Sequence, residues 1–207
     1  MESFDFKKYN SIAIMGGTFD PPHNGHLVTA QAVYDTFDVD KVVIIPLGDA
    51  PHKDRKLSPA DDRYNMVSEA ICDNTAFAIS DLEINRHGKT YTVETIEEIK
   101  KLNPDLTVYF IIGADEVNMI EAWKNPTKLL KLCRFIAVSR PGYKESELIE
   151  KVEAVRKKFG CDMYFLEVPA LDISSSELRE KVKEHKSIKY LVPKETEKYI
   201  NEHNLYE

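Results

Sequence analysis

Six short apolar runs, separated by segments with helical spacing, constrain the fold of this chain more than any other feature. Most runs are continuous instead of alternating and are rich in Val, Ile, Phe or Tyr, which is typical of strands buried on both faces. Alternation of strand and helix predicts a Rossmann-like α/β fold, a doubly wound parallel sheet with helices on both faces. The expected strands are Ile12–Met15, Val42–Pro46, Phe77–Ile84, Thr107–Ile112, Phe135–Val138 and Met163–Val168.

Helix signals lie between these runs. Ser58 and Pro59 are expected to start a helix that runs to about Asp73, and Thr92 is expected to cap Val93–Leu102. The segment Glu145–Phe159 has helical spacing. We expect one domain over residues 1–207, with residues 186–207 as a C-terminal helical segment packed on it. Within this segment, Tyr190–Glu207 is expected to form the last helix.

Composition excludes several classes of protein. The net charge of −7 disfavours a general nucleic-acid binder, although local donors can still hold a phosphate. Three scattered cysteines without C-x-x-C spacing indicate a reduced cytoplasmic protein without a disulfide framework or zinc site. The chain shows no signal-peptide pattern and no apolar run of about 18 residues, so neither export nor a membrane partner is expected. The sequence leaves open whether the chain forms homo-oligomers.

The densest chemical signal is the string GGTFDPPHNGH, residues 16–26, which directly follows the first expected strand. Gly16 and Gly17 let the main chain approach a ligand closely. His23 and His26 are three residues apart at the start of a helix, so their rings share one face beside its amide-rich end. Imidazole donors and amides suit a polyphosphate. In the alternative interpretation, this is a stiff turn whose histidines only cap the helix.

This string resembles the H-x-G-H signature of the nucleotidyltransferase superfamily, and in particular its bacterial nicotinate-mononucleotide adenylyltransferase version. The resemblance extends to the loop at 46–53, which contributes Lys53, and to Arg63 and Met66 on the next helix. Arg63 could contact phosphate or pair with an acid such as Glu69. Taken alone, the charged loop is equally consistent with an ordinary solvated surface.

Two further stretches resemble the pyridine and nucleotide pockets of that family. The pattern from Glu83 to Thr95 is similar to E-x-x-R-x-G-x-S-Y-T-x-x-T, with Thr90 in place of the usual serine. Without the resemblance, Tyr91 and Thr92 could equally be a packed tyrosine and a plain cap, and Trp123 a core residue. The resemblance places the pyridine nucleotide at Tyr91, Thr92, Trp123, Lys124 and Arg140, and the adenosine nucleotide near Gly113 and Asp115.

The last signal is the capping box formed by Ser174 and Glu177, with Arg179 one turn into the helix. Serine hydroxyls, amides and an arginine can form a second anion site. The segment resembles the superfamily motif I-S-S-T-x-I-R, with Ser176 in place of threonine and Leu178 in place of isoleucine. In isolation it could also be an amphipathic helix without a ligand. With the matching C-terminal end, the resemblance covers essentially the whole chain.

The resemblance implies an enzyme that transfers AMP from ATP to nicotinate mononucleotide. It assigns His23, His26 and Arg179 to catalysis, with ATP also held by Gly16, Gly17, Thr18, Phe19, Lys53, Gly113, Asp115, Ser175 and Ser176. Mg²⁺ is expected to enter with ATP, and no protein residue is assigned as a metal ligand. Alternatives are transfer to phosphopantetheine or nicotinamide mononucleotide, a nucleotide sensor that has lost catalysis, and a passive interaction domain.

Overall fold

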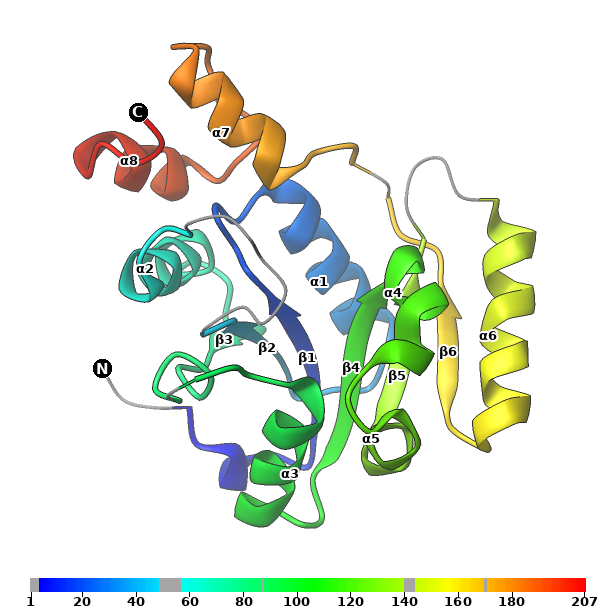
Figure 1. Ribbon diagram of the computed structural model, residues 1–207. Coiled ribbons are helices and arrows are strands. Elements are labelled where there is room, and N and C mark those ends of the chain that lie inside the picture. Colours follow the sequence, from blue (N-terminus) through cyan, green and yellow to red (C-terminus); the bar gives the residue numbers. More distant parts are fainter. Residues whose placement is uncertain (1–3, 49–56, 87, 140–143, 170) are drawn as a thin grey trace.

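A six-stranded parallel sheet forms the centre of the computed structural model, which describes residues 4–48, 57–86, 88–139, 144–169 and 171–207 (Figure 1). The strands run in the order β3-β2-β1-β4-β5-β6. Chain connections therefore reverse direction between the neighbours β1 and β4, and in such sheets ligands bind beyond the carboxyl ends of those strands. The strands are β1 (Ser11–Gly17), β2 (Lys41–Pro46), β3 (Phe77–Ile79), β4 (Thr107–Gly113), β5 (Arg134–Val138) and β6 (Met163–Leu166).

Helices cover both faces of the sheet, as the alternating pattern predicts. One face packs against α1 and α2 through side chains such as Val33 and Val67. The opposite face packs against α3, α4, α5 and α6 through a larger apolar cluster that includes Ile96, Leu129 and Val152. The helices are α1 (Asn24–Thr36), α2 (Ala60–Ala70), α3 (Thr92–Leu102), α4 (Ala114–Met119), α5 (Pro126–Leu132), α6 (Glu145–Phe159), α7 (Ser175–Lys183) and α8 (Lys194–Glu202), with 3₁₀ turns at Phe6–Lys8 and Ile120–Ala122.

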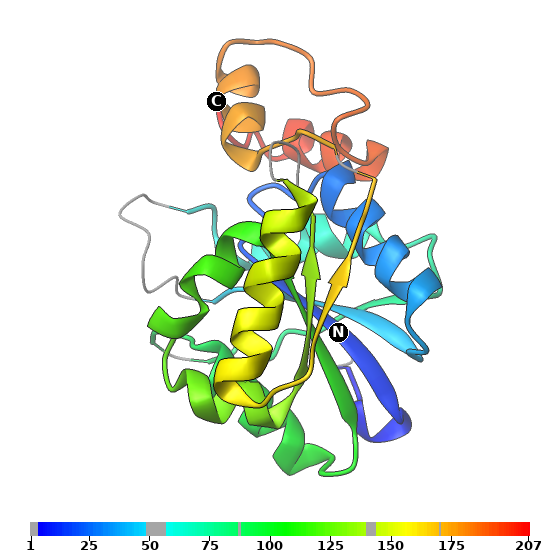
Figure 2. The same cartoon turned by 90° about the vertical axis from the view of Figure 1, so that its right-hand side faces the viewer.

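A third apolar cluster joins the C-terminal helices to the rest of the molecule. Met66 on α2 is fully buried against Leu178 of α7 and Ile200 of α8. In both views of the ribbon, α7 and α8 lie at the end of the molecule where α1 begins (Figures 1 and 2). The C-terminal segment is therefore packed over the carboxyl edge of the sheet.

The expected strands and the main helices are confirmed, with different ends in several places. Strand β3 stops at Ile79 instead of Ile84, because the Leu82 N–H turns back to the Ser80 hydroxyl at 3.3 Å and the Asn85 N–H to the Asp81 carbonyl. Strand β6 likewise ends at Leu166, before Val168, whose N–H donates to the Ser139 hydroxyl at 3.1 Å.

The predicted helix starts at Ser58 and Thr92 are each wrong by one residue. Pro59 is the N-cap of α2, and α2 ends at Ala70 because residues 71–73 form turns. Tyr91 is the N-cap of α3, so Thr92 is its first helical residue. The last helix is shorter than the predicted 190–207: it begins after Pro193 and ends before His203. No helix among the described residues is both long and apolar enough to cross a membrane.

Candidate active site

The two histidines of the 16–26 loop stack against each other at the start of α1. Their ring centroids are 3.6 Å apart with 24° between the planes. His23 is the N-cap, and its main-chain N–H donates to Nδ1 of His26 at 3.1 Å. Because Nδ1 of His26 is an acceptor, the proton of the neutral ring lies on Nε2. The capping bond therefore makes Nε2 the donor atom of the neutral His26 ring.

Small residues and a buried aromatic ring hold this pair in place. A Cβ on Gly25 would lie 3.0 Å from Nδ1 of His23, and a Cβ on Gly17 would lie 2.9 Å from the Phe19 ring. Phe19 is 2% exposed, has φ of 50°, and meets the His26 ring edge-on at 5.0 Å. Its side chain thus packs against His26. Because this side chain is buried, the predicted contact of Phe19 with ATP can involve only its main chain.

Arg63 is held by main-chain carbonyls at the start of α2. It is 2% exposed, and its guanidinium donates to four main-chain carbonyls: Ser58, Thr18, Leu47 and Gly48, at 2.6–3.2 Å. These bonds hold the guanidinium to the surrounding main chain, and the phosphate contact of Arg63 stays a prediction. Arg63 ties together the loops that follow β1 and β2, because each loop presents carbonyls to the start of α2.

The start of α7 meets the same loop. Ser174 caps α7 by accepting from the Glu177 N–H at 3.2 Å, which confirms the predicted N-cap. The reciprocal half of the predicted capping box differs, because Oε2 of Glu177 accepts from the Ser174 hydroxyl at 3.0 Å and not from the Ser174 main chain. Nη1 of Arg179 donates to the Asp20 carbonyl at 2.7 Å. This contact, between residues 159 positions apart, brings the arginine to the histidine-bearing loop.

The hydroxyls of Ser175 and Ser176 are engaged within the protein. Ser175 Oγ donates to the Pro21 carbonyl at 2.9 Å, and Ser176 Oγ accepts from Nη2 of Arg179 at 3.1 Å. Both serines therefore stabilise the contact between α7 and the 16–26 loop. Their direct contact with ATP stays a prediction.

Phe110 of β4 links this loop to the predicted pyridine site. A Cβ on Gly16 would lie 3.2 Å from Cζ of Phe110, whose ring meets Trp123 edge-on with centroids 6.2 Å apart. Gly113 ends β4 as the N-cap of α4, and Asp115 is exposed in the first turn of that helix. The exposed carboxylate lies at the sheet edge where the adenosine contact is predicted.

Four of the predicted pyridine-site residues lie together at the start of α3 and in the segment before α5. Nζ of Lys124 lies 4.0 Å from the centroid of the Tyr91 ring and 2.5 Å from Oε1 of Glu94. Trp123, the neighbour of Lys124, is half-buried and packs on the core through Phe110. Thr92 adjoins Tyr91 at the first position of α3. Lys53 and Arg140, the remaining predicted cations, lie outside the described residues.

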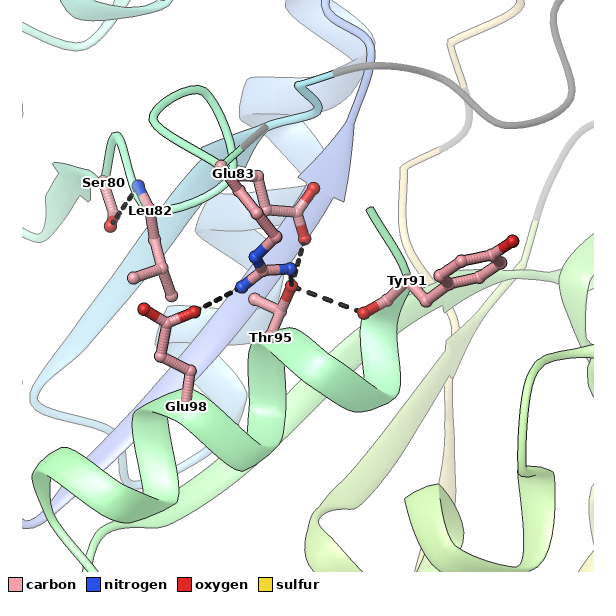
Figure 3. A network of polar contacts seen from close by, with 7 residues as sticks. Ser80, Leu82, Glu83, Tyr91, Thr95 and Glu98 are labelled. Carbon is pink, nitrogen blue, oxygen red and sulfur yellow. Dashed lines mark hydrogen bonds and ion pairs between the residues drawn. The ribbon is translucent and has the colours of Figure 1, made fainter. Parts of the chain in front are cut away.

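A polar network fixes the loop that leads into α3 (Figure 3). Thr95 Oγ1 donates to Oε1 of Glu83 at 2.7 Å, and Arg86 bridges Thr95 at 2.9 Å to Glu98 at 2.5 Å. Burial raises the pKa of Glu83, and hydrogen bonds from Thr95 and Thr90 and the charge of Arg86 oppose that rise only in part. The network anchors the segment that carries Tyr91.

Sequence reasoning missed three structural contributors to the site: the carbonyl contacts of Arg63, the central position of Phe110 and the close approach at Gly48. A Cβ on Gly48 would overlap the Glu83 carbonyl. One signal for Arg63 was available, because it shares the spacing of the buried residues Met66, Val67 and Ala70 on α2. Among the described residues, no group of three or more His, Cys, Asp or Glu could hold a metal ion.

The parallel sheet has the strand order 3-2-1-4-5-6, and its switch point carries a helix start with two histidines and, beside it, an arginine. These features define a nucleotide-binding α/β protein. The model of the cytidylyltransferase-like family matches residues 14–181. The chain belongs to this family and, within it, to the nicotinate-nucleotide adenylyltransferases, as its relatives show.

One such relative, from Thermoanaerobacter sp. (strain X514), carries the name "Probable nicotinate-nucleotide adenylyltransferase". It is 46% identical over 197 residues, covering 94% of this chain and 93% of its own. Two solved structures of Plasmodium falciparum nicotinic acid mononucleotide adenylyltransferase are similar to the whole fold. The NaAD complex has a TM-score of 0.79 and the APC complex 0.78, each with 25% identity and coverage of 96% of this chain and 98% of the other.

Proposed function

We propose that this chain transfers AMP from ATP to nicotinate mononucleotide, giving deamido-NAD and pyrophosphate as a step of NAD biosynthesis. The observation that carries the proposal is the contact between Arg179 and the Asp20 carbonyl, which joins the arginine of α7 to the stacked histidines of α1. Family membership and the NaAD complex of the similar Plasmodium falciparum enzyme support the same substrates.

The proposed mechanism is a direct in-line displacement. The 5′-phosphate oxygen of the mononucleotide attacks the α-phosphorus of ATP, the bond to the bridging oxygen breaks, and pyrophosphate leaves with that electron pair. A phosphate monoester is ionised near neutral pH, so the attacking oxygen needs no general base. Catalysis then depends on positioning and on charge stabilisation.

The catalytic residues supply that stabilisation from two helix starts. Nε2 of His26 and the amides of α1 would donate to phosphate oxygens, with His23 beside them. Arg179, bonded to the Asp20 carbonyl of the same loop, adds a full positive charge. Lys53 is proposed as a further phosphate contact by resemblance. Mg²⁺ is proposed to enter as part of the ATP complex, coordinated mainly by phosphates and water and neutralising their charge.

The pyridine ring is proposed to lie near Tyr91 and Trp123, with its carboxylate held by main-chain amides after Trp123 and by Thr92. Nζ of Lys124 lies over the Tyr91 ring, so a pyridine ring that stacks on this face of the tyrosine must displace the ammonium group. Gly113 and Asp115 are proposed to contact the adenosine part, and Arg140 the acceptor nucleotide.

We also propose a cytoplasmic protein whose residues 1–207 form one domain, because the third apolar cluster joins residues 186–207 to α2.

A pyrophosphate-release assay tests the proposal. With ATP and Mg²⁺ present, nicotinate mononucleotide, nicotinamide mononucleotide and phosphopantetheine are compared as acceptors. The proposal expects the highest kcat/KM for nicotinate mononucleotide. Preference for either other acceptor would refute the substrate assignment, and ATP binding without pyrophosphate release from any acceptor would favour the sensor alternative.

A further inference from the structure

The C-terminal turn of the chain contacts the 16–26 loop through the hydroxyl of Tyr206. Tyr206 Oη donates to Oδ1 of Asp20 at 2.8 Å, across 186 positions of sequence. Asp20 is 1% exposed, and its own main-chain carbonyl is the acceptor for Nη1 of Arg179. Asp20 therefore accepts a hydrogen bond from Tyr206 on its side chain and one from Arg179 on its main chain.

The backbone of the tail is specialised for this contact. Tyr206 has φ of 70° and Asn204 has φ of 49°, a region that L residues other than asparagine rarely adopt. A bulky residue persists there only when its surroundings hold it. The surroundings are the third apolar cluster, in which Leu205 and Tyr206 pack, and the Met66 sulfur, 3.8 Å from the Tyr206 oxygen.

The chemistry of the hydroxyl also suits a donor role toward a carboxylate. Burial and the charge of Asp20 both raise the pKa of Tyr206, so the phenol keeps its proton throughout the working range of an enzyme. A hydrogen bond from a neutral donor to a buried carboxylate is stronger than one between neutral groups. Tyr206 can thus restrain Asp20 without adding charge beside the phosphates.

We infer that Tyr206 is a positioning residue for adenylyl transfer, which holds Asp20 so that its carbonyl orients Arg179 toward ATP. The inference rests on the proposed function, because it assigns Arg179 to the triphosphate. The inference gives the Tyr206 hydroxyl a role in catalysis, whereas the packing of α8 contributes only to stability. The C-terminal turn then helps to position a residue of the site, in addition to packing on α2.

A pair of matched variants tests this separation. Tyr206→Phe removes the hydroxyl that reaches the loop. Tyr199→Phe removes a tail hydroxyl that contacts only α2, where it donates to Asp62 at 2.9 Å and accepts from Asn65 at 3.2 Å. We expect Tyr206→Phe to lower kcat/KM for ATP about tenfold with the KM for the acceptor unchanged, whereas Tyr199→Phe changes neither by more than about twofold. Circular dichroism and thermal melts establish that both variants are folded.

A double-mutant cycle tests the route through Arg179. In an Arg179→Ala background, Tyr206→Phe is expected to change kcat/KM for ATP by less than about twofold. Asp20→Ala removes the acceptor of the Tyr206 hydroxyl and provides the same test if Tyr206→Phe does not fold. A full tenfold loss in the Arg179→Ala background would overturn the inference, as would equal losses in Tyr206→Phe and Tyr199→Phe, or near-normal kcat/KM in Tyr206→Phe.

The outcome is distinguishable from failure of the proposed function. If the wild-type chain releases no pyrophosphate with nicotinate mononucleotide, the proposed function fails first. If the wild type is active and Tyr206→Phe retains its kcat/KM for ATP, the inference alone is wrong.

Discussion

The main-chain N–H of His23 donates to Nδ1 of His26 at 3.1 Å, while the two rings stack 3.6 Å apart. The bond gives the two ring nitrogens of His26 separate roles: Nδ1 caps α1, and Nε2 is the atom proposed to donate to phosphate. His26→Gln separates them, because glutamine at this position of a capping box can still accept from the N-cap N–H. We expect turnover to fall about 10²–10³-fold, the effect of losing one oriented donor to the transition state.

The measurement is steady-state pyrophosphate release, with urea denaturation to follow stability. Stability should change by less than about 1 kcal/mol, since the cap is kept. His203→Gln, at an exposed histidine that stacks on Tyr199, is the matched control and should retain wild-type turnover. Near-normal turnover of His26→Gln would remove His26 from catalysis.

Arg63 is expected to be essential for the geometry of the loops after β1 and β2. Arg63→Met keeps the buried volume but leaves four main-chain carbonyls without their donor. We expect a loss of about 3 kcal/mol or more in the free energy of unfolding, measured by urea denaturation. Arg134→Met, at a half-exposed arginine that pairs with Asp162, should cost no more than about 1 kcal/mol. Similar costs for both variants would contradict the role given to Arg63.

Glu83 should make stability depend on pH. Burial holds its pKa above the ordinary 4.5, so between that value and the higher folded pKa the folded chain keeps a proton that the unfolded chain has released. The contribution of Glu83 to the free energy of unfolding therefore decreases as pH rises through this window. Glu83→Gln keeps an acceptor for Thr95 but does not titrate.

Urea denaturation of wild type and Glu83→Gln, from about pH 4 to about pH 7, measures the difference. Relative to wild type, the variant should become more stable as pH rises. A constant difference across the series would show that Glu83 has the same pKa in the folded and unfolded chains.

Removal of Mg²⁺ should stop the reaction without affecting the fold. The ion is proposed to arrive with ATP, coordinated mainly by phosphates and water. EDTA should abolish pyrophosphate release, and added Mg²⁺ should restore it. The melting temperature of the ligand-free chain should be the same with and without EDTA. A fall in that temperature would reveal a structural metal instead.

Local patterns in the sequence predicted the geometry of the two histidines and the start of α7. The spacing of His23 and His26 placed both rings on one face of α1, and the Ser174–Glu177 spacing located the start of α7. Such predictions succeed because they depend on contacts within one helical turn. The end of β3 was wrong because apolar residues continue to Ile84, whereas side-chain bonds from Ser80 and Asp81 turn the chain earlier.

Contacts of Arg63 and Tyr206 could not be predicted in the same way. Arg63 was assigned to a phosphate or an acid, and the C-terminal end to structure alone, yet both reach the 16–26 loop. Their partners lie 45 and 186 positions away, and no periodicity connects residues at such separations. The roles of Lys53 and Arg140 stay predictions.

By itself the sequence determined the alternation of strands and helices, the position of the histidine loop after β1, and the N-cap of α7. These follow from hydrophobic periodicity and from hydrogen bonds between near neighbours in the chain. Only the tertiary structure decided which carbonyls Arg63 and Arg179 contact, and that the last turn reaches Asp20. Those choices depend on how the packed elements bring remote loops within hydrogen-bond distance, which local preferences do not encode.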